Sequence, residues 1–266
     1  MGRVEKRLAL LLLIFVLAPG IALADAAPKS GGPPDPKLVE DLVAANRILA
    51  DQGVLDGFGH VSFRSDKDPN RYFISRSLAP ELVTAADVME FDLDSNPVDQ
   101  RGRAIYLERF IHGAIYKARP DVKAIVHDHP PALIAFSIST VKLQPVYHMG
   151  SFLDGPVPVF EIQAAGGMTD MLVRNLALGD ALAKTLGPHP VALMRGHGAV
   201  VVGDSLPQVT FRAVYSVEDA KLQAEATRFG PLTYLAPEEA AKSAATNNGV
   251  LLRAWDLWKR KVAKAQ

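Results

Sequence analysis

Segments with helical and with strand periodicity are mixed along most of this chain. Apolar residues recur at helical spacing in the ranges that we expect to be helices, namely 36–51, 105–118, 131–137, 169–186, 206–229, 237–245 and 250–262. Alternating or wholly apolar short runs predict strands at 60–64, 71–75, 89–93, 122–126, 157–160, 191–194 and 199–202. Strict strand–helix–strand alternation is absent, so the pattern favours an α/β fold with a mostly antiparallel sheet between helical layers.

The first 24 residues have the layout of a secretory signal peptide. A basic segment ending at Arg7 precedes an apolar run at 8–17, and Ala22-Leu23-Ala24 is a small-x-small cleavage pattern. The apolar run is short for a stable membrane span, although an uncleaved anchor is the alternative. We therefore expect a periplasmic or secreted protein that starts near Asp25 and does not contact the membrane after cleavage.

The rest of the chain is predicted to form one main domain. Residues 25–36 contain Gly and Pro and are expected to be a flexible lead-in. Residues 37–230 are then expected to form the main domain, and 231–266 a helical tail packed on it. The whole chain has 266 residues, which is enough for a sizeable buried core.

Charge and cysteine content exclude several classes of function. Lys plus Arg and Asp plus Glu number 29 each, so nothing in the charge balance indicates a nucleic-acid partner. Cysteine is absent, which excludes disulfides, thiolate ligands and cysteine nucleophiles but leaves the compartment undecided.

Two histidines follow the strand predicted at 122–126. His127 and His129 are two residues apart, and residues at this spacing on a strand point to the same face. Imidazole nitrogens hold zinc at about 2.0–2.1 Å, so this pair is suited to a metal ion.

Other candidate ligands come from elements before and after this pair. Glu108 lies near the first turn of the helix predicted at 105–118, and His112 is one turn further on the same side. Whether His112 hydrogen-bonds Glu108 or only packs is left open. A third histidine, His197, lies between glycines after the apolar run 191–194. We therefore predict a three-histidine metal centre with an acid nearby.

Four motifs in this order make the chain similar to the class II aldolase/adducin family over residues 37–229. They are Gly59-x-Val61-Ser62, Glu108-Arg109-Phe110-x-His112, Arg119-Pro120-Asp121-x-x-Ala124-x-Val126-His127-x-His129, and His197-Gly198. The resemblance implies a three-layer α/β/α sandwich and a homotetramer with active sites at subunit interfaces. It also implies a divalent metal ion, Zn²⁺ or Mn²⁺, bound by His127, His129 and His197. Glu108 would then act as a general base or as a displaceable ligand.

Carbon–carbon bond cleavage explains why such a site would need a metal ion. Breaking a bond next to a carbonyl leaves electrons on an oxygen as an enolate, which a Lewis acid stabilises. Three neutral histidine ligands leave the positive charge of the ion uncompensated and leave coordination positions open. A neighbouring carboxylate such as Glu108 can move the proton that the reaction requires.

The chain departs from the sugar-phosphate aldolases of this family where they bind phosphate. The glycine turn is followed by His60 instead of asparagine, and the later Thr-Gly pair is replaced by a loop with Ser75, Arg76 and Ser77. We predict that these four residues bind substrate, because the planar guanidinium of Arg76 suits a carboxylate. Binding of another oxyanion, such as phosphate, and a merely exposed Arg76 are left open.

A second departure concerns the catalytic acid. Where the aldolases carry a tyrosine contributed by a neighbouring subunit, this chain has His148. The alternatives are that Tyr147 takes this place or that His148 only packs. Imidazole titrates near neutral pH, so His148 is predicted to protonate a carbanion.

These departures resemble the decarboxylase branch of the family, whose members act on hydroxylated aromatic or pyridine dicarboxylates. We therefore predict a divalent-metal-dependent carbon–carbon lyase, favoured as a decarboxylase of a hydroxylated aromatic or oxo-carboxylate. The expected partner is a small, carboxylate-bearing molecule. Two alternatives are a retro-aldolase acting on a hydroxy-carbonyl compound and a non-catalytic, adducin-like binding protein.

Overall fold

A computed structural model of the protein describes residues 1–2 and 27–264. Most of the predicted signal peptide lies at 3–26, outside the described residues. No helix within the described ranges is long and apolar enough to cross a membrane.

The centre of the molecule is a seven-stranded sheet with the order β3-β2-β1-β4-β7-β6-β5. Every neighbouring pair is antiparallel except β5 and β6, which are parallel. The predicted α/β class with a mostly antiparallel sheet is confirmed. The strands are β1 (His60–Arg64), β2 (Arg71–Ser75), β3 (Val88–Asp92), β4 (Ala124–Asp128), β5 (Val159–Phe160), β6 (Val191–Met194) and β7 (Gly198–Gly203).

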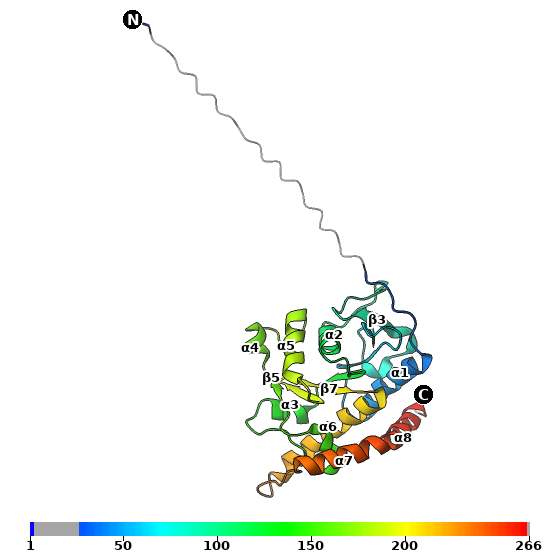
Figure 1. Cartoon of the computed structure of the whole chain (residues 1–266), viewed down its shortest axis with the longest axis vertical. Helices are drawn as coiled ribbons and strands as arrows, with labels where there is room; N and C mark the ends of the chain where they lie inside the picture. Colours follow the sequence, from blue (N-terminus) through cyan, green and yellow to red (C-terminus); the bar gives the residue numbers. More distant parts are fainter. Residues whose placement is uncertain (3–26, 265–266) are drawn as a thin grey trace.

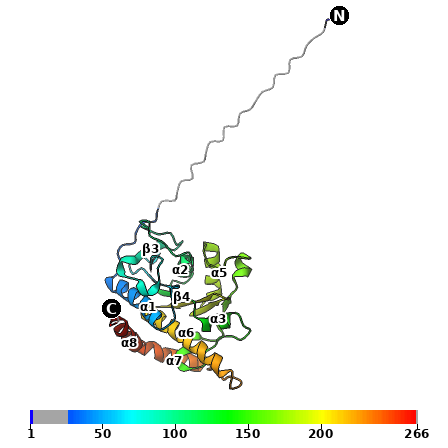
Figure 2. The same cartoon turned by 180° about the vertical axis from the view of Figure 1, so that it is seen from behind.

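Helices cover both faces of the sheet, and each face has its own apolar core (Figures 1 and 2). One face packs against α1 (Pro36–Asp51), α3 (Pro131–Ser137), α6 (Leu206–Ala226) and α8 (Leu252–Ala263), next to which lies α7 (Pro237–Val250). The other face packs against α2 (Arg109–Ala118) and α5 (Leu176–Leu186), with α4 (Ile162–Gly166) beside α5. The 3₁₀ segments are η1 (Pro80–Leu82), η2 (Ala85–Asp87) and η3 (His148–Leu153).

Strand β4 shows how the alternation of side chains separates the two cores. Ala124 and Val126 belong to the core under α1 and α6, whereas Ile125 belongs to the core under α2 and α5. His127 follows the same alternation as Ile125. It therefore points to the α2 face, opposite His60 of β1, its partner in the strand register.

Several element boundaries differ from the prediction, among them the starts of α2, β4 and α5. Helix α2 begins at Arg109 and not at residue 105, so that Glu108 precedes it. The strand expected at 122–126 is β4, which begins at Ala124, because the Val122 amide still bonds the Arg119 carbonyl and extends the preceding turn. The helix expected at 169–186 begins only at Leu176. Asn175 caps it by accepting a hydrogen bond from the Leu178 amide, and the residues before Asn175 form a loop.

Both ends of the described chain are held against the domain. Trp255 and Trp258 of α8 are buried in the core, and Lys259 pairs with Asp41 of α1. At the other end, residues 27–35 have no regular secondary structure. They are nevertheless anchored, since the hydroxyl of Ser30 donates to the Glu90 carboxylate.

Close packing of β4 and β7 gives a prediction about stability. A Cβ at Gly198 would lie 1.9 Å from the Asp128 carbonyl oxygen, so Gly198→Ala has to push the two strands apart. We expect the free energy of unfolding in urea to fall by about 1–3 kcal/mol.

Gly249→Ala in α7 is the matched control, because an added Cβ there meets nothing within 4 Å. Alanine favours a helix over glycine by up to about 1 kcal/mol, so this variant should be as stable as the natural protein or slightly more stable. Equal stability of the two variants would contradict the close approach of β4 and β7.

Candidate metal centre

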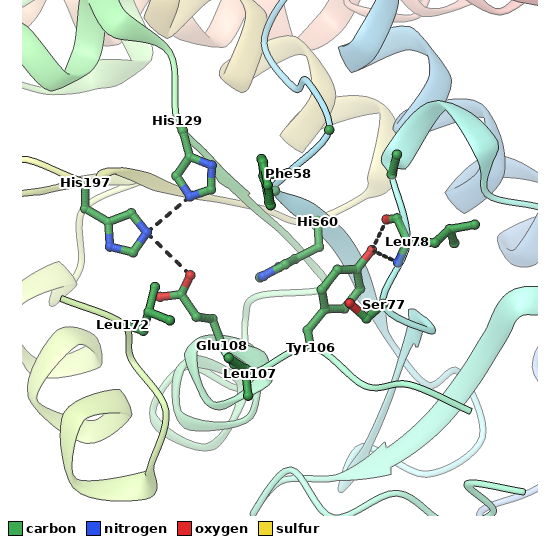
Figure 3. A pocket seen from close by; sticks show the side chains of 13 residues that line it. Phe58, His60, Ser77, Leu78, Tyr106, Leu107, Glu108, His129, Leu172 and His197 are labelled. Atoms are coloured by element: carbon green, nitrogen blue, oxygen red, sulfur yellow. Dashed lines mark hydrogen bonds and ion pairs between the residues drawn. The ribbon is translucent and has the colours of Figure 1, made fainter. Parts of the chain in front are cut away.

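Four side chains from separate parts of the chain meet at one end of the sheet. His127 is the fourth residue of β4 and His129 follows the strand, while His197 lies in the tight turn between β6 and β7. Glu108 directly precedes α2. One ligand atom of each of the four lies within 4.8 Å of the others, so the predicted cluster does come together. Figure 3 shows three of the four, Glu108, His129 and His197.

Four of the six distances within the cluster are close to those around a tetrahedral ion. The Nε2 atom of His129 lies 3.0 Å from that of His127 and 3.1 Å from that of His197. Glu108 Oε2 lies 3.4 Å from the Nε2 atoms of both His127 and His197. Four tetrahedral ligands at about 2.0–2.1 Å from an ion are separated by about 3.3–3.4 Å, so the cluster has room for one cation.

Backbone carbonyls orient two of the three imidazoles. His127 Nδ1–H donates to the Ala199 carbonyl at 2.9 Å, and His197 Nδ1–H donates to the Met171 carbonyl at 2.9 Å. In a neutral imidazole the other nitrogen then carries a lone pair. Both lone pairs face the centre of the cluster, and this donor set fits a divalent cation.

Glu108 is held in its ionised form. Burial alone would raise its pKa, but the neighbouring His127 and His197 lower the pKa well below its usual range. Its Oε1 atom accepts a hydrogen bond from the Val173 amide at 2.9 Å, which leaves Oε2 directed at the imidazoles. The carboxylate can therefore serve as a fourth ligand or accept a proton beside the ion.

The imidazole of His129 is kept neutral, as a metal ligand must be. Burial lowers its pKa, and the adjacent His127 and His197 lower it further, to about 3. His197 differs: burial lowers its pKa, but the interaction with the Glu108 carboxylate and the hydrogen bond to the Met171 carbonyl together raise it above its usual value.

A cavity of about 540 Å³ opens beside this cluster. Glu108, His129 and His197 form one wall, and Figure 3 shows their side chains facing the same space. The rest of the lining is mostly apolar or aromatic and comprises Gly57, Phe58, Gly59, His60, Ser77, Leu78, Ala79, Tyr106, Leu107 and Leu172. Two of the predicted substrate-binding residues, His60 and Ser77, therefore line the cavity.

The other two predicted substrate-binding residues lie beside the cavity and have partners of their own. Ser75 Oγ and the hydroxyl of Tyr106 are 3.1 Å apart. Arg76 Nε donates to Asp87 Oδ1 at 2.6 Å, and the Arg76 side chain is 39% exposed. Within this chain the guanidinium thus has an acidic partner already, and its contact with a substrate carboxylate stays a prediction.

His148 is exposed at the start of η3 and does not line the cavity of its own chain. Its carbonyl accepts hydrogen bonds from Ser243 and Asn247 of α7, and the preceding loop is tied to α6 through the Val146 amide and Asp219. The prediction placed His148 in the site of a neighbouring subunit, which one chain does not test, so it stays a prediction.

The structure answers the question left open for His112. This residue hydrogen-bonds His60 instead of Glu108, with His112 Nε2 2.7 Å from His60 Nδ1. Its other nitrogen contacts Ser62 Oγ at 2.6 Å. The sequence indicates this arrangement in part, since His60 and Ser62 are two residues apart on a strand and so point to the same face.

Sequence reasoning missed the loop at 169–175. Because that segment was expected to be helical, its backbone contacts with the cluster through Met171 and Val173 were not anticipated. Leu172, between them, lines the cavity.

Comparisons with known proteins agree with the resemblance drawn from the sequence motifs. Residues 40–224 match the family described as Class II Aldolase and Adducin N-terminal domain. Decarboxylase tropJ of Talaromyces stipitatus is 36% identical over 248 residues, covering 84% of this chain and 93% of that protein. The 3,4-dihydroxyphthalate decarboxylase of Arthrobacter keyseri is 30% identical over 205 residues, covering 72% of this chain and 79% of that protein. The solved structure of L-fuculose 1-phosphate aldolase from Glaciozyma antarctica has a similar fold, with a TM-score of 0.71 at 22% identity, covering 89% of this chain and 95% of that one.

The cluster predicts the metal content of the purified protein. We expect close to one divalent ion per chain, measured by elemental analysis after loosely bound ions have been removed. Replacing His127 and His129 together with Ala should abolish binding, because it removes two of the four donors. Saturation with the ion at about one hundred times its Kd should stabilise the natural protein by about 3 kcal/mol and leave the double variant unchanged.

His189→Ala is the control for this experiment. His189 is partly exposed and pairs with Asp154 on the surface, so its loss should not change the metal content. Undiminished metal in the double variant would refute the site.

Proposed function

Because the chain belongs to the class II aldolase and adducin family, we propose that it is a divalent-metal-dependent carbon–carbon lyase that decarboxylates a hydroxylated aromatic carboxylate. The observation that carries the proposal is the composition of the cavity. Its polar wall, formed by Glu108, His129 and His197, faces apolar and aromatic side chains that include Phe58 and Leu172. A flat ring bearing oxygen substituents matches such a lining, since the ring contacts apolar groups while its oxygens face the cation site.

Four residues would hold the metal ion, namely Glu108, His127, His129 and His197. Three nitrogen donors and one oxygen donor at tetrahedral separations favour zinc, with manganese as the alternative. When bound, the ion supplies a Lewis acid for negative charge that develops on a neighbouring oxygen.

Glu108 is the proposed proton carrier. The ionised carboxylate takes the proton of a ring hydroxyl of the substrate. The resulting phenolate carries negative charge to the ring carbon that bears the carboxylate group, and Glu108 delivers the proton to that carbon. The carbon–carbon bond then breaks, carbon dioxide leaves, and the electron pair of the bond restores the aromatic ring, whose oxygen keeps the negative charge. The protonation state of the enzyme is thereby restored. The amide of Val173 keeps Glu108 in position throughout.

Two relatives support decarboxylation over aldol cleavage. The relatives that are 36% and 30% identical to this chain are both described as decarboxylases. A retro-aldolase would use the same cluster, because both reactions leave negative charge on an oxygen next to the broken bond. A non-catalytic binding protein is disfavoured, since such a protein would not require four convergent donors.

The location and assembly of the protein are part of the proposal. We place it in the periplasm or outside the cell after removal of the signal peptide, as a homotetramer in which His148 approaches the site of a neighbouring subunit. N-terminal sequencing of the mature protein and its mass in solution test these two statements.

Carbon dioxide release tests the reaction class. We expect the metal-loaded protein to release carbon dioxide from at least one member of a panel of hydroxylated benzene and pyridine dicarboxylates, with the products identified by mass. Glu108→Gln should retain at least part of the metal, because the three histidines remain, and should lower kcat by about 10²–10⁴-fold, since the amide cannot carry a proton.

The panel also contains unphosphorylated hydroxy-carbonyl compounds. Aldehyde release without carbon dioxide would instead show a retro-aldolase. Full activity of Glu108→Gln would remove Glu108 from the mechanism whichever reaction is found.

A further inference from the structure

Behind the cavity, four buried side chains form a continuous hydrogen-bonded chain between β1 and α2. The Tyr116 hydroxyl lies 2.8 Å from Ser62 Oγ, and Ser62 Oγ lies 2.6 Å from His112 Nδ1. His112 Nε2 in turn lies 2.7 Å from His60 Nδ1. We call these four residues the His60 relay. Each of them is at most 3% exposed, and His60 is the member that lines the cavity.

The two elements build the relay through their ordinary periodicities. His60 and Ser62 are two residues apart and lie on the same face of β1, the face that points to α2. His112 and Tyr116 are four residues apart, one turn of α2, and face the strand together. The relay is therefore a feature of two rigid elements and not of a loop.

The direction of the hydrogen bonds follows from counting donors. A protonated tyrosine has one O–H, and Ser62 Oγ is the partner that the structure gives it. If Tyr116 donates to Ser62, then Ser62 donates to His112 Nδ1, and the proton of His112 lies on Nε2 and is donated to His60 Nδ1. In the reverse direction Ser62 would donate to Tyr116, and the buried O–H of Tyr116 would have no acceptor, which is costly. The first direction is favoured.

Burial keeps the members of the relay in the charge states that this count assumes. It lowers the pKa of His112 to about 3, with a further contribution from His127, so that His112 is neutral. It also raises the pKa of Tyr116, and the hydrogen bond with Ser62 offsets only part of that increase. Tyr116 is therefore protonated, and able to donate, near neutral pH.

We propose that the relay fixes His60 as the tautomer with its proton on Nε2, and that this N–H donates a hydrogen bond to an oxygen of the substrate next to Glu108. Figure 3 shows the His60 ring extending into the cavity between Glu108 and Tyr106, with a nitrogen at its tip. Since Nδ1 is occupied by His112, Nε2 is the nitrogen that remains for a ligand. The inference rests on the proposed function for the identity of the ligand, a hydroxylated aromatic carboxylate.

The far end of the relay limits what His60 can do. If His60 gave its Nε2 proton to the substrate, replacement through the relay would leave Tyr116 as a buried phenolate, which the surrounding apolar core disfavours. His60 is accordingly a fixed hydrogen-bond donor and not the source of the proton that reaches the product. His112, Ser62 and Tyr116 are positioning residues that act through it. A site with such a fixed donor discriminates against analogues that lack the matching oxygen.

The tautomer is measurable without any turnover. Nitrogen NMR of the zinc-loaded protein with ¹⁵N-labelled histidine distinguishes a protonated from an unprotonated ring nitrogen, and His60→Gln identifies the signals of His60 by their loss. We expect Nε2 of His60 to be protonated and Nδ1 to be unprotonated. A proton on Nδ1 would overturn the proposal.

Binding of a probe compound tests the role of the donor. With 2,3-dihydroxybenzoate as the probe and calorimetry as the measurement, His60→Leu should raise Kd about tenfold, because one hydrogen bond to a charged oxygen is lost. His60→Gln retains an N–H near the Nε2 position and should stay within about threefold of the natural protein. Equal weakening in both variants, or none in either, would contradict donation by His60.

Variants at His112 test the relay itself. His112→Gln can still donate to His60 and accept from Ser62, so it should preserve both the tautomer and the probe affinity. His112→Phe can do neither, and His60 should then populate both tautomers and bind the probe several-fold more weakly. Should His112→Phe not fold, the spectrum of the natural protein and the His112→Gln variant still decide the question.

Tyr72→Phe is the matched control. Tyr72 is a fully buried tyrosine that also packs against α2, but its hydroxyl bonds Ser95 and lies outside the relay. Its loss should leave the His60 signals and the probe affinity unchanged. The proposed function fails separately: no carbon dioxide release together with the expected tautomer would leave the relay intact and reject the reaction.

Discussion

The crowding of three imidazole nitrogens and one carboxylate around one point is the constraint on which this structure depends. His129 approaches both His127 and His197 to hydrogen-bonding distance, while backbone carbonyls hold the protons of His127 and His197 on their outer nitrogens. Such a cluster is unfavourable without a positive charge at its centre. The rest of the fold supplies the rigidity that keeps these donors together, with antiparallel strands on both sides of β4 and helices on both faces of the sheet.

Residue spacing predicted much of this arrangement. Two histidines two residues apart at a strand end, His127 and His129, are predicted to point to the same face, and the structure confirms this. The mostly antiparallel sheet was predicted because the strand-like runs do not alternate strictly with helices. His197 was a candidate from its position between glycines after an apolar run, and the resemblance to a family motif strengthened it, because nothing local in a glycine-flanked histidine says which distant strand end it will meet.

Other parts could not be read from the sequence, for physical reasons. Residues 169–175 have helix-compatible composition, but Asn175 competes by capping a later start, and tertiary contacts of the preceding backbone settle the outcome. The partner of His112 was missed because a helix periodicity gives its face but not what the neighbouring strand presents there. The ion pair of Arg76 with Asp87 likewise depends on how a short 3₁₀ turn folds back against β2.

The loop at 169–175, which supports the cluster, affects which substitutions the protein can accept during evolution. It contacts Glu108 and His197 through the amide of Val173 and the carbonyl of Met171, which are main-chain atoms that any residue provides. The side chain between them, Leu172, forms part of the cavity wall. Substitutions at this position can therefore reshape the space open to a ligand while the inorganic part of the site is left untouched, so that new specificities are accessible by single steps.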